Sequence, residues 1–277
     1  MPCAPTPLWD PRQYLRHAED RSRPFTDLLA RVPALPGQGR RPARIADLGC
    51  GAGNVTALLA ERWRDARVTG YDNSAAMLRE ADAYAGRTLG GGSIAFARAD
   101  LTDWSPDPAE PLDLIVSNAA FQWVPGHAGR FPVWLAGLAA GGTFAFQVPG
   151  NGDAPSHALL RQLCASVRWR DRLGEAGRRR VEVLDPAQYL ARLTDLGCEV
   201  DTWETTYAHL LPGEDPVLDW VKGTGLRPVL TALAGDLAAT QAFLAEYGAL
   251  LREAYPAGPG GTVFPFRRVF VVARKRD

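Results

Sequence analysis

The sequence ARIADLGCGAGN, residues 43–54, is a short apolar run that carries one acid and then gives way to three alternating glycines. This pattern predicts a buried strand that turns tightly into a helix. Gly49, Gly51 and Gly53 have no Cβ atom to hold a ligand away from the main chain, and they allow the positive φ that such a turn often needs. We therefore expect a ligand to bind directly on the backbone of this turn.

A dinucleotide site is an alternative explanation, because its G-x-G-x-x-G fingerprint places a pyrophosphate at a helix N-terminus. The third fingerprint position here is Asn54, not Gly or Ala, and Asp47 would repel a pyrophosphate. That acid suits a ligand with a cationic end, such as S-adenosylmethionine, which carries an ammonium and a sulfonium. On the glycines alone, a purely structural turn explains the stretch equally well.

Two further acids end predicted strands in the same way. Residues 67–72, RVTGYD, place Asp72 25 positions after Asp47 (72 − 47), and residues 94–100 end in Asp100. An acid about 20 residues past the glycines is placed to accept hydrogen bonds from ribose hydroxyls. We expect Asp72 to bind the ribose and Asp100 to accept from the adenine amino group; a solvated loop carboxylate is the alternative for Asp72.

Short apolar strands alternate with helical segments through the first half of the chain. Further strands are predicted over 112–118 and 142–148, and Asn73–Ser74 should cap a helix over 75–84. This alternation predicts a Rossmann-like, mostly parallel α/β sheet with helices on both faces and a ligand crevice at the carboxyl ends of the strands. The three acids and Asn118 all fall at those ends.

The flanking regions complete the expected organisation. A helix should begin near residue 22, with Ser22 as its N-cap and Pro24 in its first turn. Residues 198–209 and 263–274 alternate like strands, which completes a seven-stranded sheet, and a helical cap lies between them. The expected division is an N-terminal lid and helix over 1–42, an α/β core over 43–214, a helical cap over 215–262 and a final core strand over 263–277.

Composition limits the possible partners. The 277 residues carry 31 basic and 31 acidic side chains, so no nucleic-acid-binding face is predicted, and short basic groups such as Arg40–Arg41 should be solvated. The four cysteines lack the spacing of a zinc site or a disulfide scaffold, and the four histidines lack ligand spacing, so no metal is expected. We expect no secretory signal and no membrane span, and therefore a cytoplasmic protein.

Four segments together resemble the signature segments of class I S-adenosylmethionine-dependent methyltransferases. They are DLGCGAGN at 47–54, GYD at 70–72, AD at 99–100 and DLIVSN at 113–118. The flanks resemble the trans-aconitate 2-methyltransferase family more specifically, in WDPRQY at 9–14, DRSRP at 20–24, NAAFQW at 118–123, GCEVDTW at 197–203, DWVKGTGLRP at 219–228 and FVVAR at 270–274. The resemblance spans nearly the whole chain.

The resemblance implies S-adenosyl-L-methionine as cofactor and S-adenosyl-L-homocysteine as product. Tyr14 and Arg23 would belong to an arm that closes over the methionine end of the cofactor. The implied cofactor-binding residues are Tyr14, Arg23, Asp47, Gly49, Cys50, Gly51, Asn54, Asp72, Asn73, Met77, Asp100, Leu101, Asn118 and Ala119.

The implied reaction is formation of a methyl ester on a carboxylate of trans-aconitate or a similar small polycarboxylate. A carboxylate is ionised at neutral pH and needs no base, so no catalytic acid or base is assigned. Gln122 and Trp123 could shape the methyl-transfer gap. Arginines would pair with the acceptor carboxylates. The candidate substrate-binding residues are His157, Tyr207, His209, Trp220, Arg227 and Arg267.

Three segments depart from the family pattern: residues 88–93, the loop before the first strand, and residues 150–157. Two alternatives therefore stay open. One is an O-methyltransferase of secondary metabolism that acts on a hydroxyl and takes its base from His127, His157 or His209. The other is a noncatalytic cofactor-binding protein of the same fold.

Overall fold

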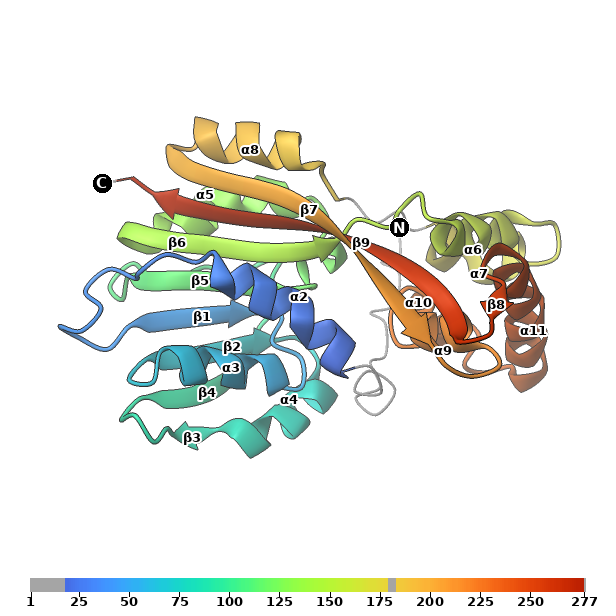
Figure 1. Cartoon of the computed structure of the whole chain (residues 1–277), viewed down its shortest axis with the longest axis horizontal. Coiled ribbons are helices and arrows are strands. Elements are labelled where there is room, and N and C mark those ends of the chain that lie inside the picture. Colours follow the sequence, from blue (N-terminus) through green and yellow to red (C-terminus); the bar gives the residue numbers. More distant parts are fainter. Residues whose placement is uncertain (1–17, 179–182, 277) are drawn as a thin grey trace. The chain divides into compact units, whose positions relative to one another are not determined.

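The computed structural model describes residues 18–178 and 183–276 (Figure 1). The chain forms two compact units. Of the described residues, the sheet unit comprises Glu19–Gly150, 183–205 and 268–276, and the helical unit comprises Ala18, 151–178 and Thr206–Arg267. None of the helices that the structure describes is long and apolar enough to cross a membrane.

The described residues form one sheet of nine strands, where seven were predicted, because two strands of only two residues join it. The strand order is β3-β4-β2-β1-β5-β6-β9-β7, with β8 paired to β9. The strands are β1 Arg44–Leu48, β2 Arg67–Asp72, β3 Gly86–Arg87, β4 Ser93–Arg98, β5 Leu112–Asn118, β6 Leu138–Pro149, β7 Cys198–Leu211, β8 Ala257–Gly258 and β9 Gly261–Lys275.

Strand direction places the carboxyl ends of five strands at one edge of the sheet. The pairs β4–β2, β2–β1, β1–β5 and β5–β6 are parallel. Strand β9 is antiparallel to β6, and β3 is antiparallel to β4. The predicted mostly parallel α/β sheet is confirmed, and Asp47 near the end of β1 and Asp72 at the end of β2 lie at the shared carboxyl edge.

Helices cover both faces of the sheet unit. In Figure 1, α2 and α3 lie in front of the sheet and α5 lies behind it. Residues of α5 and α8 pack with β5, β6 and β9 in one apolar cluster that includes Phe131, Trp134, Phe144, Phe146 and Tyr189. The helices of this unit are α2 Ala18–Ala30, which begins at the unit boundary, α3 Asn54–Arg62, α4 Ala75–Ala81, α5 Phe131–Ala136 and α8 Pro186–Asp195, with short 3-10 turns η1 Asp82–Tyr84, η2 Phe121–Trp123 and η3 His127–Arg130.

Local capping confirms one predicted helix start and corrects another. Ser74 Oγ accepts a hydrogen bond of 3.3 Å from Met77 N at the start of α4, as expected. Helix α2, in contrast, already includes Ser22 and contains Pro24 in its interior, so the prediction of a start near residue 22 with Ser22 as N-cap is wrong. The buried side chains of Phe25 and Leu28 hold this helix, which outweighs the one backbone hydrogen bond that proline cannot donate.

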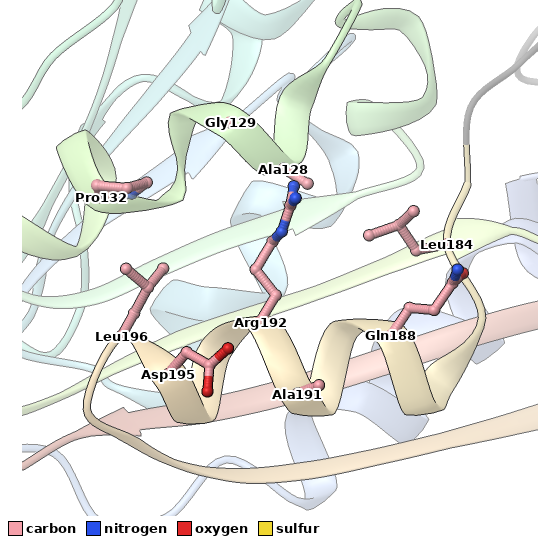
Figure 2. Close-up of a pocket in the computed structure, with 9 residues that line it drawn as sticks. All are labelled: Ala128, Gly129, Pro132, Leu184, Gln188, Ala191, Arg192, Asp195 and Leu196. Carbon is pink, nitrogen blue, oxygen red and sulfur yellow. The ribbon is translucent and has the colours of Figure 1, made fainter.

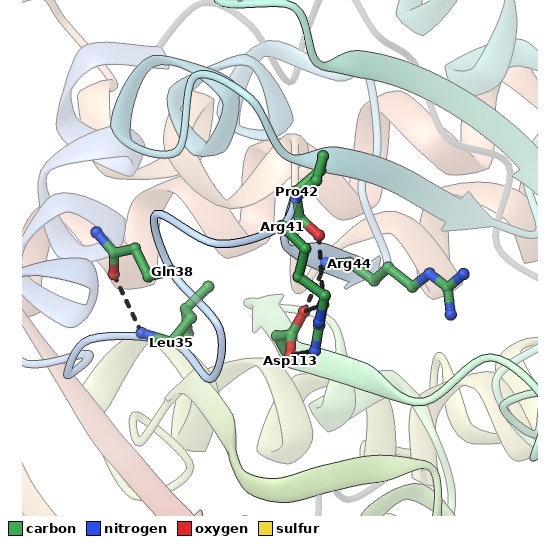
Figure 3. Close-up of polar contacts among 6 residues, drawn as sticks. All are labelled: Leu35, Gln38, Arg41, Pro42, Arg44 and Asp113. Atoms are coloured by element: carbon green, nitrogen blue, oxygen red, sulfur yellow. Dashed lines mark hydrogen bonds and ion pairs between the residues drawn. The ribbon is translucent and has the colours of Figure 1, made fainter.

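A bidentate ion pair fixes the loop before β1 to the amino edge of the sheet (Figure 3). Arg41 Nη1 and Nη2 donate to Oδ2 and Oδ1 of Asp113, each at 2.7 Å, and Arg44 N donates to Oδ2 at 2.9 Å. Asp113 is fully buried, whereas the Arg41 side chain is 47% exposed. The expectation of a merely solvated Arg40–Arg41 pair is therefore wrong for Arg41, because it neutralises a buried carboxylate.

The helical unit has its own apolar core. Its helices are α6 Pro155–Ala165, α7 Arg170–Arg178, α9 Pro216–Lys222, α10 Arg227–Ala232 and α11 Leu237–Ala254. Their buried side chains, among them Trp169, Trp220, Phe243 and Tyr247, form one cluster with Phe264 of β9. Helices α9, α10 and α11 lie within the segment 215–262 that was predicted to be a helical cap.

Candidate active site

The turn after β1 is built from glycines in the left-handed region. Gly49, Gly51 and Gly53 have φ of 78°, 55° and 80°. A Cβ on Gly49 would lie 2.1 Å from the Cβ of Ala120, whereas a Cβ on Gly51 would meet nothing within 4 Å. Gly49 is therefore required by packing, and Gly51 leaves open space beside the main chain where a ligand can approach.

Asp47, the next-to-last residue of β1, is a buried carboxylate with one unused oxygen. Thr56 Oγ1 donates to Oδ2 at 2.6 Å, and Oδ1 has no hydrogen-bond partner among the described residues. Burial raises the pKa of Asp47 to about 7, the bond from Thr56 opposes this, and the charge of Asp72 adds to it. A cation placed at Oδ1 would favour the ionised carboxylate.

Asp72 ends β2 and ties two loops together. Its Oδ2 accepts from Gly51 N at 3.0 Å, and its Oδ1 accepts from Ser74 N at 2.8 Å. Burial raises the pKa of Asp72, while the backbone N–H groups of Ser74 and Gly51 lower it. Each carboxylate oxygen has a second lone-pair direction, so ribose hydroxyls can still donate to it.

Asp100 and Asn73 meet beside these loops. Asp100 is exposed, and its Oδ1 accepts from Thr102 N at 2.9 Å and from Thr102 Oγ1 at 2.7 Å. These bonds, with a smaller contribution from the Asn73 side chain, hold the pKa of Asp100 below its usual value. Met77 and Leu101 are buried. The structure thus brings the acid expected at the adenine close to the residue that follows Asp72.

The segment after β5 contains strain and a second unused acceptor. Ala119 has φ of 55°, the only positive φ at a non-glycine among the described residues. Its N donates to Gln147 O at 2.9 Å, and its O accepts from Gln122 Nε2. Gln122 is buried and its Oε1 has no partner among the described residues. Strained backbone of this kind costs about 1–3 kcal/mol and concentrates at functional sites.

Two residues at this edge were missed by the sequence analysis. Arg268 Nη1 donates to Gln147 Oε1 at 3.0 Å, and Gln147 Nε2 donates to Asn118 Oδ1. All three side chains are at most 6% exposed. A polar residue inside an apolar strand was the available signal, in FAFQV at 144–148 and FRRVFVV at 266–272.

Three of the predicted substrate residues lie together in the helical unit. The ring of His209 lies 4.7 Å from that of Trp220 and 6.3 Å from that of Tyr207. All three side chains are buried, at 7%, 1% and 4% exposure. Phe266 lies against the same two rings, 5.7 Å from Trp220 and 6.5 Å from His209.

The other predicted substrate residues of this unit lie outside that aromatic group. His157 Nδ1 is 3.2 Å from Ser156 Oγ, and its Nε2 is 3.4 Å from the position a Cβ on Gly225 would take. Burial lowers the pKa of His157 to about 4. Arg227 begins α10 and is half-buried. Arg267 lies on β9, where its main-chain N donates to Asn151 Oδ1 at 2.7 Å.

The remaining predicted residues differ in position. Tyr14 lies outside the described residues, and Arg23 is exposed on α2. Asn54 is the first residue of α3, and Trp123 ends η2. Cys50 lies in the glycine turn, where burial raises the pKa of its thiol.

His127 is a histidine of the apolar core. It is 2% exposed, its Nε2 lies 2.8 Å from Tyr189 Oη, and its ring stacks on Phe121. Burial lowers its pKa to about 4. Among the residues that the structure describes, no group of three or more His, Cys, Asp or Glu side chains could hold a metal ion.

A hollow of about 580 Å³ lies between η3, the start of α5, and α8 (Figure 2). Pro132 and Leu196 line it, and the Arg192 side chain extends across it toward Ala128. None of the predicted cofactor or substrate residues lines this hollow.

The fold and the site define a class of enzyme. A family model described as "Methyltransferase domain" matches residues 45–142, which contain the glycine turn and the acids of the carboxyl edge. YcgJ from Bacillus subtilis aligns with a TM-score of 0.54 at 16% identity, covering 93% of this chain and 99% of that one. A Haemonchus contortus phosphoethanolamine N-methyltransferase bound to S-adenosylhomocysteine aligns with a TM-score of 0.54 at 15% identity, covering 92% of this chain and 53% of that one. These likenesses show the fold, and the protein is a class I S-adenosylmethionine-dependent methyltransferase.

Relatives of high identity narrow the class. The chain is 66% identical over 275 residues to a trans-aconitate 2-methyltransferase of Streptomyces avermitilis, covering 99% of both chains. Identity is 65% to one of Streptomyces coelicolor, covering 99% and 89%, and 48% to one of Rhodococcus jostii, covering 96% and 99%. The chain belongs to the trans-aconitate 2-methyltransferase family, and its cofactor is S-adenosyl-L-methionine.

Proposed function

We propose that the protein transfers a methyl group from S-adenosylmethionine to a carboxylate of trans-aconitate and so forms a methyl ester. The observation that supports this acceptor most strongly is the 66% identity to a trans-aconitate 2-methyltransferase over 99% of both chains. The identity extends beyond the matched methyltransferase domain, through the helical unit that contains the candidate acceptor residues.

The residues at the carboxyl edge suit the cofactor. Asp47 Oδ1 and Gln122 Oε1 are buried acceptors without a partner among the described residues, as expected where a cationic group is to bind. The open space at Gly51 suits a ligand lying on the main chain. The proposed cofactor-binding residues that the structure describes are Arg23, Asp47, Gly49, Cys50, Gly51, Asn54, Asp72, Asn73, Met77, Asp100, Leu101, Asn118 and Ala119.

When bound, the cofactor supplies a methyl group on a sulfonium, which a nucleophile attacks in line. The acceptor carboxylate is ionised at neutral pH, so the protein need not remove a proton from it. Its residues must instead hold the two groups close, aligned and away from water. An enzyme that methylates a hydroxyl would need a base, and His127 was one candidate for it. His127 instead packs in the apolar core against Tyr189 and Phe121, which favours an acceptor that needs no base.

Arginine is the side chain best suited to bind the acceptor carboxylates, because its planar guanidinium pairs with a carboxylate at two points. We assign this role to Arg227 and Arg267. Tyr207, His209 and Trp220 would supply a rigid wall, an assignment supported by their ring contacts. His157, whose Nε2 approaches Gly225, would border the same ligand.

The N-terminal segment is proposed to act as a lid. Tyr14 and Arg23 precede the first strand, and closing segments exclude water from sites of this kind. A chain that lacks residues 1–17 retains every described strand and α2 from Ala18. It should fold, yet lose turnover; full turnover would contradict the lid.

An acceptor panel tests the proposed function. Titration calorimetry first measures S-adenosylmethionine binding, and mass spectrometry then measures methyl ester formed from trans-aconitate, cis-aconitate and a monocarboxylate. We expect tight cofactor binding, and more methyl ester from trans-aconitate than from cis-aconitate or the monocarboxylate. Cofactor binding without ester would point to another acceptor, and to residues 150–157 as the region that changed it.

A further inference from the structure

Three buried polar side chains form a hydrogen-bonded chain at the carboxyl ends of β5 and β6. Asn118, Gln147 and Arg268 are 6%, 0% and 4% exposed. Asn118 pairs with Gln147 across β5 and β6, and Arg268 pairs with Pro149 across β6 and β9. Polar groups in such a position are costly to bury unless they are bonded, so their arrangement is strongly constrained.

The chemistry of the three groups fixes the direction of every bond in this chain. A guanidinium has donors only, so Gln147 must turn Oε1 toward Arg268, whose Nη1 lies 3.0 Å away. Gln147 Nε2 then faces Asn118 and donates to its Oδ1. Asn118 must therefore keep Oδ1 toward Gln147 and present Nδ2 away from it. Arg268 thus determines which atom of Asn118 is available to a ligand.

Nδ2 of Asn118 has no acceptor among the described residues and is a hydrogen-bond donor at the carboxyl edge. The sulfonium and ammonium of the cofactor cannot accept a hydrogen bond, and the unused acceptors of Asp47 and Gln122 suit them instead. The anionic partners left for Nδ2 are the carboxylate of the cofactor and a carboxylate of the acceptor, and the cofactor Kd of a variant distinguishes the two. A carboxylate oxygen is the matching partner for an N–H donor, and such a bond is charge-assisted.

We propose that Arg268 and Gln147 are positioning residues for methyl transfer, and that through them Asn118 presents Nδ2 to a carboxylate oxygen of the acceptor. The proposal rests on the proposed function, because it requires an anionic acceptor. The main chain of Asn118 can still border the cofactor. One bonded oxygen fixes the orientation of the carboxylate, and a misplacement of about 1 Å in such a site costs about 10²-fold in rate.

The first test replaces the donor without changing the size of the side chain. Asn118→Asp keeps an oxygen toward Gln147 Nε2 and turns the second oxygen toward the acceptor. We expect kcat/KM for trans-aconitate to fall about 10²-fold. The Kd for S-adenosylmethionine should not rise, because the proposal gives this donor to the acceptor and not to the carboxylate of the cofactor.

The second test reverses the orientation of the Asn118 side-chain amide by substituting Gln147 and leaving Asn118 unchanged. Gln147→Glu keeps an acceptor for Arg268 but removes the donor to Oδ1, so Asn118 must rotate and donate Nδ2 to the new carboxylate. The acceptor then faces Oδ1, and kcat/KM should fall as in Asn118→Asp. Arg268→Lys, which retains an N–H donor, should keep more activity than Arg268→Met.

Arg274→Met is the matched control. Arg274 lies on the same strand, and its Nε bonds Gly141 O at 3.4 Å at the opposite edge of the sheet. Its kinetics should equal those of the wild type, and melting temperatures with cofactor present identify any variant that has merely lost its fold.

Several results would overturn the proposal. Weaker cofactor binding by Asn118→Asp with an unchanged KM for trans-aconitate would assign Asn118 to the cofactor alone. Equal losses in Arg268→Lys and Arg268→Met would show a purely structural arginine, and unaffected Arg268→Met would remove it from the reaction. A wild-type protein that binds the cofactor and forms no ester would refute the proposed function and, with it, the acceptor role of Asn118. An active wild type with unaffected variants would refute the positioning chain alone.

Discussion

Thr56 donates a hydrogen bond of 2.6 Å to one oxygen of Asp47, and the other oxygen of that buried carboxylate has no partner among the described residues. A half-satisfied buried carboxylate is unfavourable without a ligand, because the charged form lacks both solvent and a counter-charge. Asp47 is therefore a group whose protonation should change when a cationic cofactor binds.

Cofactor binding should release protons below neutral pH. The pKa of ligand-free Asp47 is raised to about 7, mainly by burial, so most of this group is protonated at pH 6. A bound cation favours the ionised form and lowers that pKa. Binding at pH 6 should therefore release about one proton per site, and affinity should fall by up to about tenfold for each pH unit below neutrality. Calorimetry at pH 6 in two buffers of different ionisation enthalpy measures this proton directly.

Asp47→Asn supplies the control for that prediction. It should bind the cofactor more weakly at pH 8 and release no proton at pH 6. In the ligand-free protein the pKa of Asp47 is higher in the folded state than in the unfolded chain, where it is about 4. The contribution of Asp47 to the free energy of unfolding is therefore fully present below pH 4 and is lost as the pH rises through 7. The variant should thus melt higher than the wild type at pH 8. A buffer-independent enthalpy in the wild type would contradict the coupling.

Replacing the ribose acid should weaken cofactor binding selectively. Asp72→Ala removes the proposed acceptor of the ribose hydroxyls and the bonds to Gly51 N and Ser74 N. A lost charged hydrogen bond costs about 1.5–3 kcal/mol, or about 10- to 150-fold in Kd. Asp100→Asn keeps an acceptor oxygen and should have a smaller effect. A larger effect at Asp100 would exchange the two assignments.

The glycine turn and the acids at the strand ends could be predicted because their signals are local. Residue spacing within about 25 positions carries both the turn chemistry and the strand that precedes it. The insertion of β9 between β6 and β7 depends on pairing between strands more than 100 residues apart, such as Phe146 with Val271, and no local pattern encodes it.

Gln147 and Arg268 could not be predicted for a related reason. Gln147 and Arg268 occupy apolar strands, where alternation predicts which face a residue occupies but not which polar groups meet across strands. The predicted start of α2 was wrong because Pro24 was taken as a first-turn residue, whereas the helix begins at Ala18 and contains Pro24 in its interior. In α2, the burial of Phe25 and Leu28 outweighs the local signal of the proline.

The ion pair between Arg41 and Asp113 should stabilise the fold without affecting the cofactor. Arg41→Met leaves the buried carboxylate with only the Arg44 N–H, and should lower the free energy of unfolding by about 3 kcal/mol. Arg40→Met, at the exposed neighbouring position, should change it by less than about 0.5 kcal/mol. Urea denaturation measures both. If Arg41→Met were as stable as the wild type, solvent would stabilise the Asp113 carboxylate as well as arginine does.

Arg227 gives the sharpest test of the acceptor's charge. If its guanidinium binds one carboxylate of trans-aconitate, Arg227→Leu leaves that charge unpaired and should raise KM about 10- to 150-fold, the equivalent of one charged hydrogen bond. A monocarboxylate that offers only its reacting group should lose far less, and the cofactor Kd should stay constant. Arg252→Leu, which removes an exposed partner of Asp215 in the same unit, controls for a general loss of charge. The predicted quantity is the ratio of the KM change for trans-aconitate to the KM change for the monocarboxylate. A substitution that only loosens α10 would raise both KM values equally. That result would show that Arg227 stabilises the helix and does not bind the substrate.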